Sequence, residues 1–475
     1  MIPGPLLLLL VPLLMAGIVY VFLRWETLSA LLAAGTSLAM GIGIISLPLD
    51  RPVLLWGGTQ VTLGETVDLF GRELALGLGD RAAMALLFFS AAAIFLLAWR
   101  VAPHALLFPM GLGVLSLLNG ALLIRPFIYA VLLIGIAAAL SVFALQRADS
   151  PPSRGGMRYL TFTVLALPGV LVAHWLLDRY AIMPDRSELL SISATLLAFS
   201  FALLLGVVPF HSWVTAIASD GVPLAGAFVF TVNNGVVWFL LFDFLETYPW
   251  LSAHPQFDVL MLVAGLGMVT MGGALAPAQQ RLGPLMGLAA LADNGATLIA
   301  LGLSSKLGLS LSLFSLMVRP FSLALMAAGL SGLRERSGGK DGVETLRGKG
   351  WDLPWSTGVF VIGGLSAAGL PISAGFAWRW ALYRSLIQQS PGAVLLMLLA
   401  SLGMLAGVWR WLNVLLERPD SEENRSVISL APAEGWLTAL VITGAIGANV
   451  IVACFPQLLA LVANQITGTY TLFAR

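Results

Sequence analysis

Charged residues are scarce in this chain. Lys, Arg, Asp and Glu make up 10% of its 475 residues, whereas a soluble domain carries about a quarter. Hydrophobic residues make up 59%, and the mean hydropathy is +0.93. A soluble multi-domain enzyme needs more charge on its surface, and an intrinsically disordered chain needs far fewer apolar residues. The composition therefore predicts a polytopic membrane protein.

Cysteine is almost absent as well. Cys454 is the only one, which excludes a disulfide scaffold, a cysteine-ligated iron–sulfur cluster and a haem attachment motif. The four histidines lack the spacing of metal ligands, and no glycine-rich nucleotide motif follows a strand. The 25 basic and 24 acidic residues form no basic stripe for nucleic acid. We expect no metal or other cofactor on this chain, no active site of its own and no nucleic-acid partner.

Apolar runs of about 20 residues, long enough to cross a bilayer, recur along the whole chain. The runs lie at 4–23, 27–48, 82–99, 103–123, 126–146, 159–177, 188–210, 223–245, 258–276, 283–303, 308–333, 355–383, 391–415 and 434–460. The stretch 49–81 is too charged to span and is expected to be a surface loop with a short amphipathic piece. The pattern predicts an all-α transmembrane domain over 1–475 with about 14 membrane-spanning helices.

The distribution of basic residues indicates how the chain is oriented. With the N-terminus outside, thirteen Lys and Arg fall on inner segments and eight on outer ones, in line with the positive-inside rule. The segment 334–349 contributes most to this bias, and the counts include Arg418, Arg425 and Arg475. Abundant Arg, Ala and Gly beside three Lys favour a GC-rich bacterial genome. We expect a multi-pass protein of the bacterial inner membrane with its N-terminus outside.

Two of the predicted spans contain residues that break helices. Pro209 lies near the end of the span 188–210, and Gly369-Leu370-Pro371 interrupts the span 355–383. Proline lacks a backbone donor and clashes with the preceding turn. Broken helices at corresponding places in two halves are typical of inverted-repeat transporters, but Pro and Gly are also simply frequent in membrane helices. The spacing alone leaves both interpretations open.

The residues around these breaks resemble a known family. Val208-Pro209-Phe210-His211-Ser212-Trp213, followed by Gly221-Val222-Pro223, resembles the Pro-Phe-His-x-Trp and Gly-Ala-Pro segments of antiporter-like membrane subunits. Such subunits occur in respiratory complex I, membrane-bound hydrogenases and multi-subunit cation/proton antiporters. The segment 369–376 resembles the family's Gly-Leu-Pro-x-Ser-x-Gly-Phe motif. The resemblance covers about residues 80–425, and the length is nearest to the N- and M-type complex I subunits. It implies 14 helices with two inverted five-helix repeats, here at 103–247 and 258–417.

The resemblance also implies a row of titratable groups at mid-membrane, because charge in hydrocarbon is kept where it moves ions. This chain departs from the usual set. No acidic residue occurs from 81 to 148, where the family has a glutamate, and Leu204 stands at the first lysine position. Asn233 and Asn234 lie near the second lysine position, and Arg379 is the matching cation after the Gly-Leu-Pro motif. Most of the usual proton-carrying groups are therefore missing.

A few intramembrane charges remain as candidates for an ion path. Asp293 is the only deep carboxylate and the first candidate. Arg319 and Arg379 stay charged, so they would either tune the field of a water-filled path or pair with Asp293 and lock helices together. His211 would be a half-channel proton group or a hydrogen-bonding tie across the helix break. Arg125 is expected to snorkel to the outer interface.

Together these features predict an antiporter-like membrane subunit that contributes to proton or sodium translocation coupled to electron transfer. It would belong to a complex similar to NADH:quinone oxidoreductase or a hydrogenase, with sister antiporter-like chains and a redox arm as partners. Two alternatives stay open at this point. One is a degenerate, non-conducting structural subunit of such a complex, and the other is the membrane partner of an ion-driven uptake complex.

Overall fold

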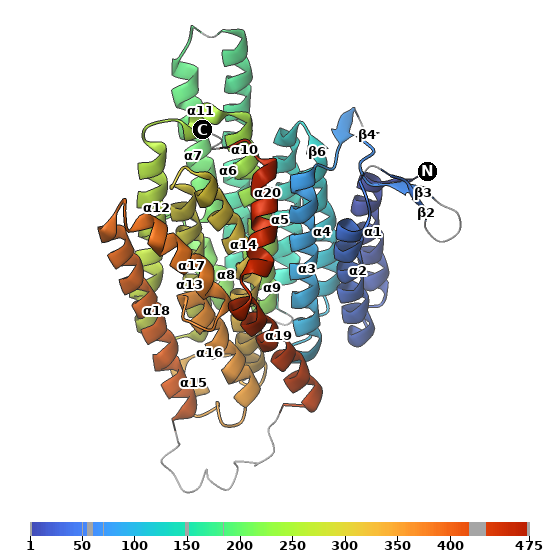
Figure 1. Cartoon of the computed structure of the whole chain (residues 1–475). Helices are drawn as coiled ribbons and strands as arrows, with labels where there is room; N and C mark the ends of the chain where they lie inside the picture. The colour runs from blue at the N-terminus through green and yellow to red at the C-terminus, as the bar shows by residue number, and fades with distance from the viewer. Residues whose placement is uncertain are drawn as a thin grey trace, which may run out of the picture.

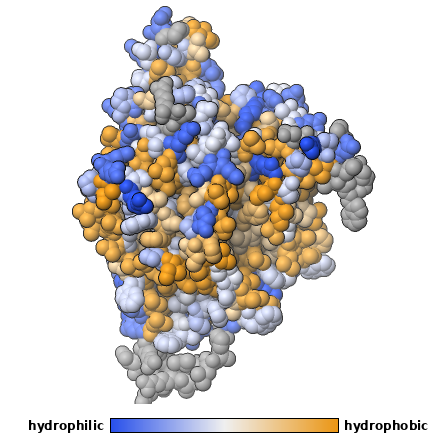
Figure 2. All heavy atoms as spheres, in the orientation of Figure 1, coloured by the Kyte–Doolittle hydropathy of each residue, from blue (hydrophilic) through white to orange (hydrophobic). Residues whose placement is uncertain are grey.

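The computed structural model is a bundle of long helices with two small β-sheets at one end (Figure 1). It describes residues 2–49, 51–54, 60–69, 71–147, 152–183, 185–417 and 434–472. Twelve of the described helical segments are long and apolar enough to cross a membrane. Apolar side chains cover the flanks of the bundle, and hydrophilic residues gather toward its two ends (Figure 2). The chain is therefore a polytopic, all-α membrane protein, as the composition predicts.

The first part of the chain contains every strand that the structure describes. Its helices are α1 (Gly4–Val21), α2 (Glu26–Ser46), α3 (Leu78–Val101), α4 (Leu107–Leu123), the short η1 (Phe127–Tyr129) and α5 (Ala130–Leu145). Its strands are β1 (Ile2–Pro3), β2 (Val53–Leu54), β3 (Gln60–Thr62), β4 (Val67–Leu69), β5 (Arg72–Leu74) and β6 (Ile124–Arg125). The sheet orders are β1-β3-β2 and β4-β5-β6.

These strands correct one prediction. We expected a loop with an amphipathic piece over 49–81, but the described part of that stretch forms short strands. They pair with the chain start, through β1, and with the end of α4, through β6. Alternating Val, Leu and Thr suit short strands, and pairing with distant segments is not visible in the local sequence.

The middle of the chain contains the first broken span. Its elements are α6 (Arg154–Ile182), α7 (Glu188–Leu205), α8 (Ser212–Asp220), α9 (Pro223–Phe228), the π-helical turn η2 (Val229–Asn233), α10 (Asn234–Thr247) and α11 (Pro249–Ser252). The break predicted at Pro209 is present, but α7 already ends at Gly206. Gly206 has the left-handed φ of +68°, a conformation that commonly ends helices.

The last part contains the second broken span and a third that was not predicted. Its elements are α12 (Phe257–Leu275), η3 (Ala276–Ala278), α13 (Leu282–Leu301), α14 (Lys306–Glu335), α15 (Val343–Leu346), α16 (Pro354–Ala368), α17 (Ala374–Leu386), α18 (Pro391–Leu416), α19 (Trp436–Cys454) and α20 (Gln457–Thr469). The predicted break at Gly369 is confirmed, because α16 ends there with a φ of +77°. The predicted span 434–460 is instead two helices, α19 and α20, separated at Phe455 and Pro456.

Each predicted span has a counterpart among the described elements. The twelve helical segments that could cross a membrane account for all but two of the predicted spans. The remaining two are α4, an apolar helix of 17 residues, and the broken pair of α16 and α17. Both chain ends lie at the same end of the bundle (Figure 1), as an even number of crossings requires.

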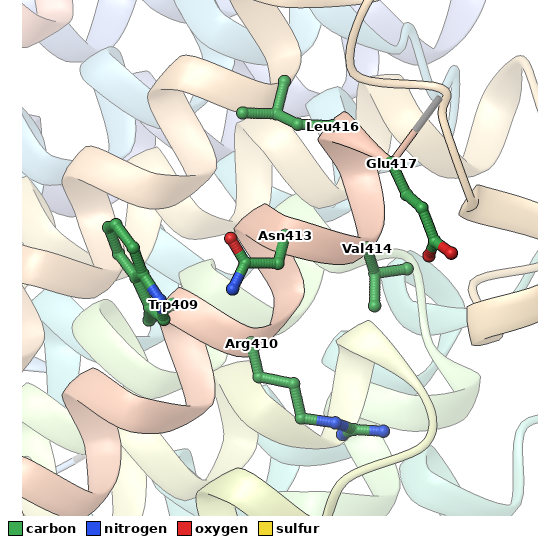
Figure 3. Close-up of a pocket in the computed structure, with 6 residues that line it drawn as sticks. All are labelled: Trp409, Arg410, Asn413, Val414, Leu416 and Glu417. Atoms are coloured by element: carbon green, nitrogen blue, oxygen red, sulfur yellow. The ribbon is translucent and has the colours of Figure 1, made fainter. Parts of the chain in front are cut away.

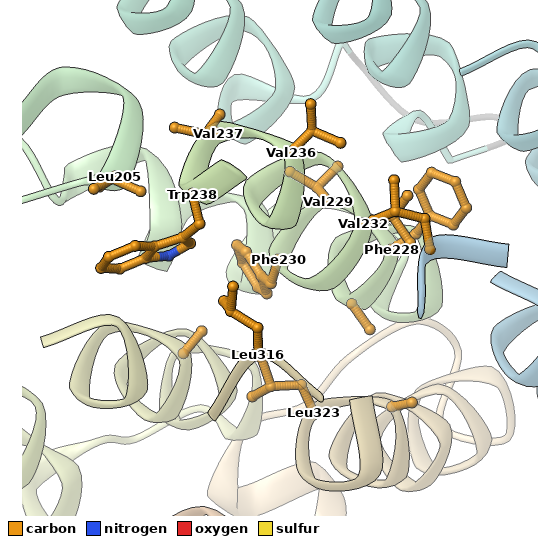
Figure 4. Packing of buried hydrophobic residues seen from close by; sticks show 14 of the residues in the cluster. Leu205, Phe228, Val229, Phe230, Val232, Val236, Val237, Trp238, Leu316 and Leu323 are labelled. Carbon is orange, nitrogen blue, oxygen red and sulfur yellow. The ribbon is translucent and has the colours of Figure 1, made fainter. Parts of the chain in front are cut away.

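Three helical segments form the centre of the bundle. In the most apolar 18-residue window of Pro223–Thr247 every residue is buried. In the corresponding windows of α13 and α14 the buried share is 94%, against 17% in that of α19. Figure 4 shows Phe230 of this first segment pointing toward Leu316 of α14, and all of the labelled side chains are buried. A polar side chain on these segments contacts protein rather than lipid. Most of the candidate residues lie on them.

Glycines allow α12 and α13 to approach closely beside the candidate site. A Cβ atom on Gly295 would lie 2.6 Å from the carbonyl oxygen of Gly265, and one on Gly265 would lie 2.5 Å from that of Gly295. Small residues commonly mediate such close helix contacts in membranes. This contact fixes α13 against α12 two residues after Asp293.

Candidate functional site

Asp293 lies near the middle of α13 and is 8% exposed. Its Oδ2 accepts a hydrogen bond of 2.7 Å from Nε of Arg319, and its Oδ1 lies 3.6 Å from Nη2 of Arg379. The structure thus brings together the three charged residues that the sequence singles out. Asp293 lies between two guanidinium groups that come from α14 and α17.

Each of the three guanidinium nitrogens of Arg319 on α14 donates a hydrogen bond. Besides Asp293, it donates from Nη1 to Oδ1 of Asn234 at 2.8 Å and from Nη2 to Oγ1 of Thr297 at 3.1 Å. Thr297 is in turn 2.8 Å from the hydroxyl of Ser315. A buried charge is tolerated when it is paired and hydrogen-bonded in this way. Arg319 therefore joins α10, α13 and α14 at one point, as expected of an Arg–Asp contact that locks helices.

Arg379 on α17 is equally buried, at 3% exposed, but its surroundings differ. Its guanidinium forms no hydrogen bond with the described residues, and its Nε and Nη2 are buried without an acceptor. Its nearest charged contact is the 3.6 Å one to Asp293, and it lies 5.3 Å from the ring of Trp378. Two guanidinium groups share one carboxylate, so this cluster carries one excess positive charge.

The break between α16 and α17 determines where Arg379 lies. Gly369 ends α16 in a left-handed conformation, and a Cβ atom there would lie only 2.6 Å from Cδ of Arg379. Glycine is therefore required both by the backbone angle and by the side chain that passes over it. Pro371 lies in the turn between the two helices and not on either of them. The predicted break residues thus position the second cation of the cluster.

Asn233 and Asn234 face two different groups of residues. Asn234 binds Arg319, whereas Nδ2 of Asn233 donates to Oγ of Ser141 at 2.8 Å and to Oη of Tyr159 at 3.1 Å. Neighbouring residues on a helix point about 100° apart, and the π turn η2 ends at Asn233. Such π turns often occur at functional sites. The two asparagines therefore link the charged cluster to a second polar cluster on α5 and α6.

A small cavity lies between the two clusters. Its volume is about 10 Å³, and its lining includes Tyr159, Leu204, Trp213 and Asn234. This volume is at the lower limit for one water molecule. Leu204 stands where the resemblance places a lysine, so an apolar side chain closes the cavity at the position of a usual proton carrier.

His211 is not part of either cluster among the described contacts. It precedes the first residue of α8 and is half-buried, and its Nδ1 has no hydrogen-bond partner in the described part of the chain. A hydrogen bond across the first break comes from Trp213, whose Nε1 donates to the carbonyl oxygen of Leu203 at 3.2 Å. Both roles considered for His211, a proton group and a hydrogen-bonding tie, stay predictions.

Arg125 has a partner that the sequence did not single out. Its Nη2 lies 2.7 Å from Oδ2 of Asp80 and its side chain is 34% exposed, and the expected snorkelling to the outer interface stays a prediction. Asp80 also accepts from the amide of Gly77 at 3.1 Å. The strand pairing of β5 with β6 brings this end of α4 close to the start of α3. The sequence could not reveal the pair, because strands that it did not predict hold the partners together.

Sequence reasoning also missed the uncharged residues that complete the site. Thr297, Ser141 and Tyr159 supply acceptors at hydrogen-bond distance, and Trp238 donates to Oδ1 of Asn294 at 3.2 Å. Isolated hydroxyl and amide groups are common in membrane helices, so their types gave no signal. Position is the one feature that could have identified such a residue: Thr297 lies one helical turn after the candidate Asp293.

The larger hollows of the surface lie elsewhere. One of about 490 Å³ runs along the end of α18, lined by Trp409, Arg410, Asn413 and their neighbours (Figure 3). Arg410 donates there to the carbonyl oxygens of Pro277 and Gln279. None of the candidate path residues lines this hollow, so the site is a buried polar chain rather than an open pocket.

Comparisons with known proteins agree with the resemblance. The family model described as NADH:quinone oxidoreductase/Mrp antiporter, TM matches residues 137–405. NADH-quinone oxidoreductase subunit N of Rhodococcus opacus (strain B4) is 25% identical over 294 residues, which are 62% of this chain and 52% of that protein. The matched part of the chain thus spans about half the length of this relative.

Two solved structures share the fold over nearly the whole chain. A chain in the structure of the Mrp complex from Dietzia sp. DQ12-45-1b has a TM-score of 0.77 at 16% identity, with 99% of this chain and 97% of that chain covered. A chain of respiratory complex I from Thermus thermophilus with bound NADH has a TM-score of 0.76 at 18% identity, with 98% and 99% covered. The family match includes the helices that carry Asp293, Arg319 and Arg379. The chain belongs to the NADH:quinone oxidoreductase/Mrp antiporter transmembrane family.

Proposed function

We propose that this chain is an antiporter-like membrane subunit of a multi-subunit complex, in which it contributes to proton or sodium translocation coupled to electron transfer. The family match over 137–405 supports this proposal. So do the names of its relatives, a subunit of NADH-quinone oxidoreductase and a chain of an Mrp complex.

One observation carries the proposal: a buried carboxylate on the central helix α13 lies between two guanidinium groups. A carboxylate can take up and release a proton, and ionisable groups in membrane interiors usually mark ion paths. From Asp293 the polar chain continues through Arg319 to Asn234 and, by way of Asn233, to Tyr159. Protons would move along this chain with Asp293 as the group that changes protonation, because the arginines stay charged.

The two breaks support an internal repeat of 103–247 and 258–417. The fourth span of each segment is the broken one, and in each case a glycine with positive φ, Gly206 or Gly369, ends the first half. In Figure 1, α7 lies above α8 whereas α16 lies below α17. Opposite directions are what an inverted repeat requires. Superposing the two segments on each other tests the relation, and an unrelated order of helices would refute it.

The proposed setting is a bacterial inner membrane, with the N-terminus outside and with sister antiporter-like chains and a redox arm as partners. The bias of basic residues supports the orientation, although Arg418, Arg425 and Arg475 lie outside the described residues. A cysteine at Lys340 in a Cys454→Ser background tests it. Labelling of intact cells by an impermeant maleimide at that position would show the opposite orientation.

Asp293→Asn tests the translocating role. We expect coupled ion movement to fall to the background of vesicles without the complex, since an amide cannot carry the proton, while the partner subunits still co-purify. The matched control is Asp178→Asn, whose carboxylate is 64% exposed at the end of α6. Both variants are compared with the wild type in inverted vesicles, by a fluorescent pH indicator and by the composition of the purified complex.

Undiminished ion movement in Asp293→Asn would refute the path and make the chain a structural subunit. The loss of lysine and glutamate positions, with Leu204 in the cavity, is the observation that favours that second role. Purification with a single soluble partner and no redox subunit would instead identify the membrane part of an uptake complex.

A further inference from the structure

An apolar groove of about 460 Å³ opens between α7 and α12 on the side of the bundle. Both are outer helices, since the buried share of their most apolar windows is 39% in α7 and 33% in the segment that begins with α12. The lining residues include no Asp, Glu, Lys or Arg. Packed proteins leave few voids larger than a water molecule, so a groove of this size calls for an occupant.

The deep end of the groove lies at the middle of the membrane. Leu205 lines this end, and its carbonyl oxygen accepts a hydrogen bond of 3.3 Å from Nδ2 of Asn294, near the middle of α13. From there the groove follows α7 to Ser191, a distance of about 21 Å at 1.5 Å per residue. Half of a bilayer with its headgroups measures about 20–22 Å. The groove therefore extends from the midplane to the headgroup layer of one leaflet.

The chemistry of the lining changes along this length. Apolar side chains such as Phe201 and Leu298 form the deep part. At headgroup depth the lining includes the exposed His254 and Gln256, beside α11 at the end of the bundle where both chain ends lie (Figure 1). Nδ1 of His254 accepts from the amide of Gln256 at 3.3 Å, so Nε2 is an N–H donor, and the side-chain amide of Gln256 adds two more donor hydrogens. The mouth thus offers donors to an acceptor group.

The width of the groove restricts what fits into it. Spread over a length of about 21 Å, its volume gives a mean cross-section of about 22 Å², whereas a helix about 10 Å across needs about 80 Å². A helix of a partner protein is therefore too wide. Water is disfavoured along the apolar walls, because it finds no hydrogen-bond partners there. A single hydrocarbon chain matches both the width and the walls.

We propose that the groove binds one acyl chain of a phospholipid, from the leaflet on the side of the chain ends. The ester and phosphate oxygens of this lipid accept hydrogen bonds from His254 and Gln256. Its acyl chain packs on Val207, beside the helix-ending Gly206, and on Leu298 of α13. The lipid thus supports the first break against the helix that carries the buried carboxylate. This inference does not depend on the proposed function, because it holds for a conducting and for a structural subunit.

The first experiment maps the lipid on the protein. The purified complex is reconstituted into phosphatidylethanolamine vesicles that contain a photoactivatable analogue, with a diazirine either at the end of an acyl chain or next to the glycerol. After extraction and washing in detergent, the retained analogue is activated by light. We expect the chain-end probe to label the segments around Leu205 and Leu298, and the glycerol probe to label residues 250–257. Labelling of the outer helix α19 reports loosely bound lipid and should be several times weaker.

The second experiment fills the groove. Ala198 lines it and is exposed on α7, so Ala198→Phe should reduce labelling of the groove to the level of α19. The matched control is Ala39→Phe, at an exposed alanine of α2 that does not line the groove, and it should label like the wild type. His254→Ala should lower the retained label about fivefold, as expected for the loss of one hydrogen bond.

Three results would overturn the proposal. One is labelling of the groove that is no stronger than that of α19 in the wild type, and another is undiminished labelling in Ala198→Phe. The third is an isoprenoid quinone with a diazirine in its tail that labels the groove and resists excess phospholipid. If Ala198→Phe does not assemble, the map of the wild type and the result with His254→Ala decide.

Discussion

At the scale of single residues, the two arginines of the site differ in whether their guanidinium nitrogens have hydrogen-bond acceptors. Arg319 has three acceptors and serves as a fixed joint between helices. Arg379 has none among the described residues and is held in place by packing against Gly369 and Trp378. The same residue type therefore has two roles, which only the surrounding side chains distinguish.

Gly369→Ala tests this packing. The left-handed φ of +77° costs an L-residue about 1–2 kcal/mol, and the new Cβ would displace Cδ of Arg379 from its position 2.6 Å away. We expect a lower midpoint of thermal unfolding in detergent together with reduced ion movement.

The matched control for this change lies on the same helix. A Cβ atom on Gly358 would meet nothing within 4 Å, so Gly358→Ala should leave ion movement unchanged and raise stability by up to about 1 kcal/mol. Equal thermal midpoints for the two variants would contradict the packing argument.

At the scale of elements, Arg334 and Asp341 join α8 to α13 and α14 at one end of the bundle. Arg334 lies in the last turn of α14 and donates to the carbonyl oxygens of Ala218, Ser219 and Gly221, at the C-terminal end of α8. A cation at a helix C-terminus is favourable. Asp341 holds this guanidinium in place and also accepts from the amide of Gly283 at 2.9 Å.

This arrangement predicts a dependence on pH. Burial alone would raise the pKa of Asp341, but the charge of Arg334 and hydrogen bonds from Arg334 and Arg281 hold the pKa below its ordinary value of 3.8. The stability that Asp341 contributes is therefore complete above that value and is lost as the pH falls below it. Asp341→Asn should remove this part of the acid sensitivity.

The measurement is the thermal unfolding midpoint of the purified protein in detergent between pH 6 and about pH 3. The wild type should lose more stability over this range than Asp341→Asn. Asp352→Asn, whose carboxylate is 39% exposed and paired with Lys349, provides the control and should follow the wild type. Parallel curves for all three proteins would show that Asp341 contributes nothing to the acid response.

The elements also show how far sequence reasoning reaches. Hydrophobic runs long enough to span the bilayer predicted every crossing, and Gly369 with Pro371 predicted the second break. Asp293, Arg319 and Arg379 could be identified as candidate site residues because charged residues are so scarce in the predicted spans. The Arg125–Asp80 pair could not, because distant segments bring its two residues together. The break between α19 and α20 lies at Pro456, a local signal that the prediction of one span over 434–460 overlooked. The sequence also grouped Asn233 with Asn234, which the helix turn separates.

At the scale of the whole molecule, the polar residues form two neighbouring clusters at the bundle's centre, which meet at the adjacent Asn233 and Asn234. The helices that carry them are those most fully enclosed by other helices. Outer helices such as α1 and α19 bury few of their side chains inside the bundle. The bundle thus encloses its polar residues within apolar helices, and the exposed turn at Ile372 interrupts the apolar outer surface.

The excess charge beside that turn has a consequence for the chain before it is assembled. A fixed positive charge repels a second cation about 8 Å away by about 2 kcal/mol when the effective dielectric constant is about 20. A single copy in a bilayer should therefore be a poor leak for sodium and protons. Vesicles containing the purified wild-type chain should hold an ion gradient as well as empty ones, and Arg379→Gln should make them leakier. If the wild type leaks as fast as this variant, the charge is no barrier. Otherwise the charge of Arg379 acts as a barrier to cations, so a subunit without its complex would not dissipate the ion gradient across the membrane.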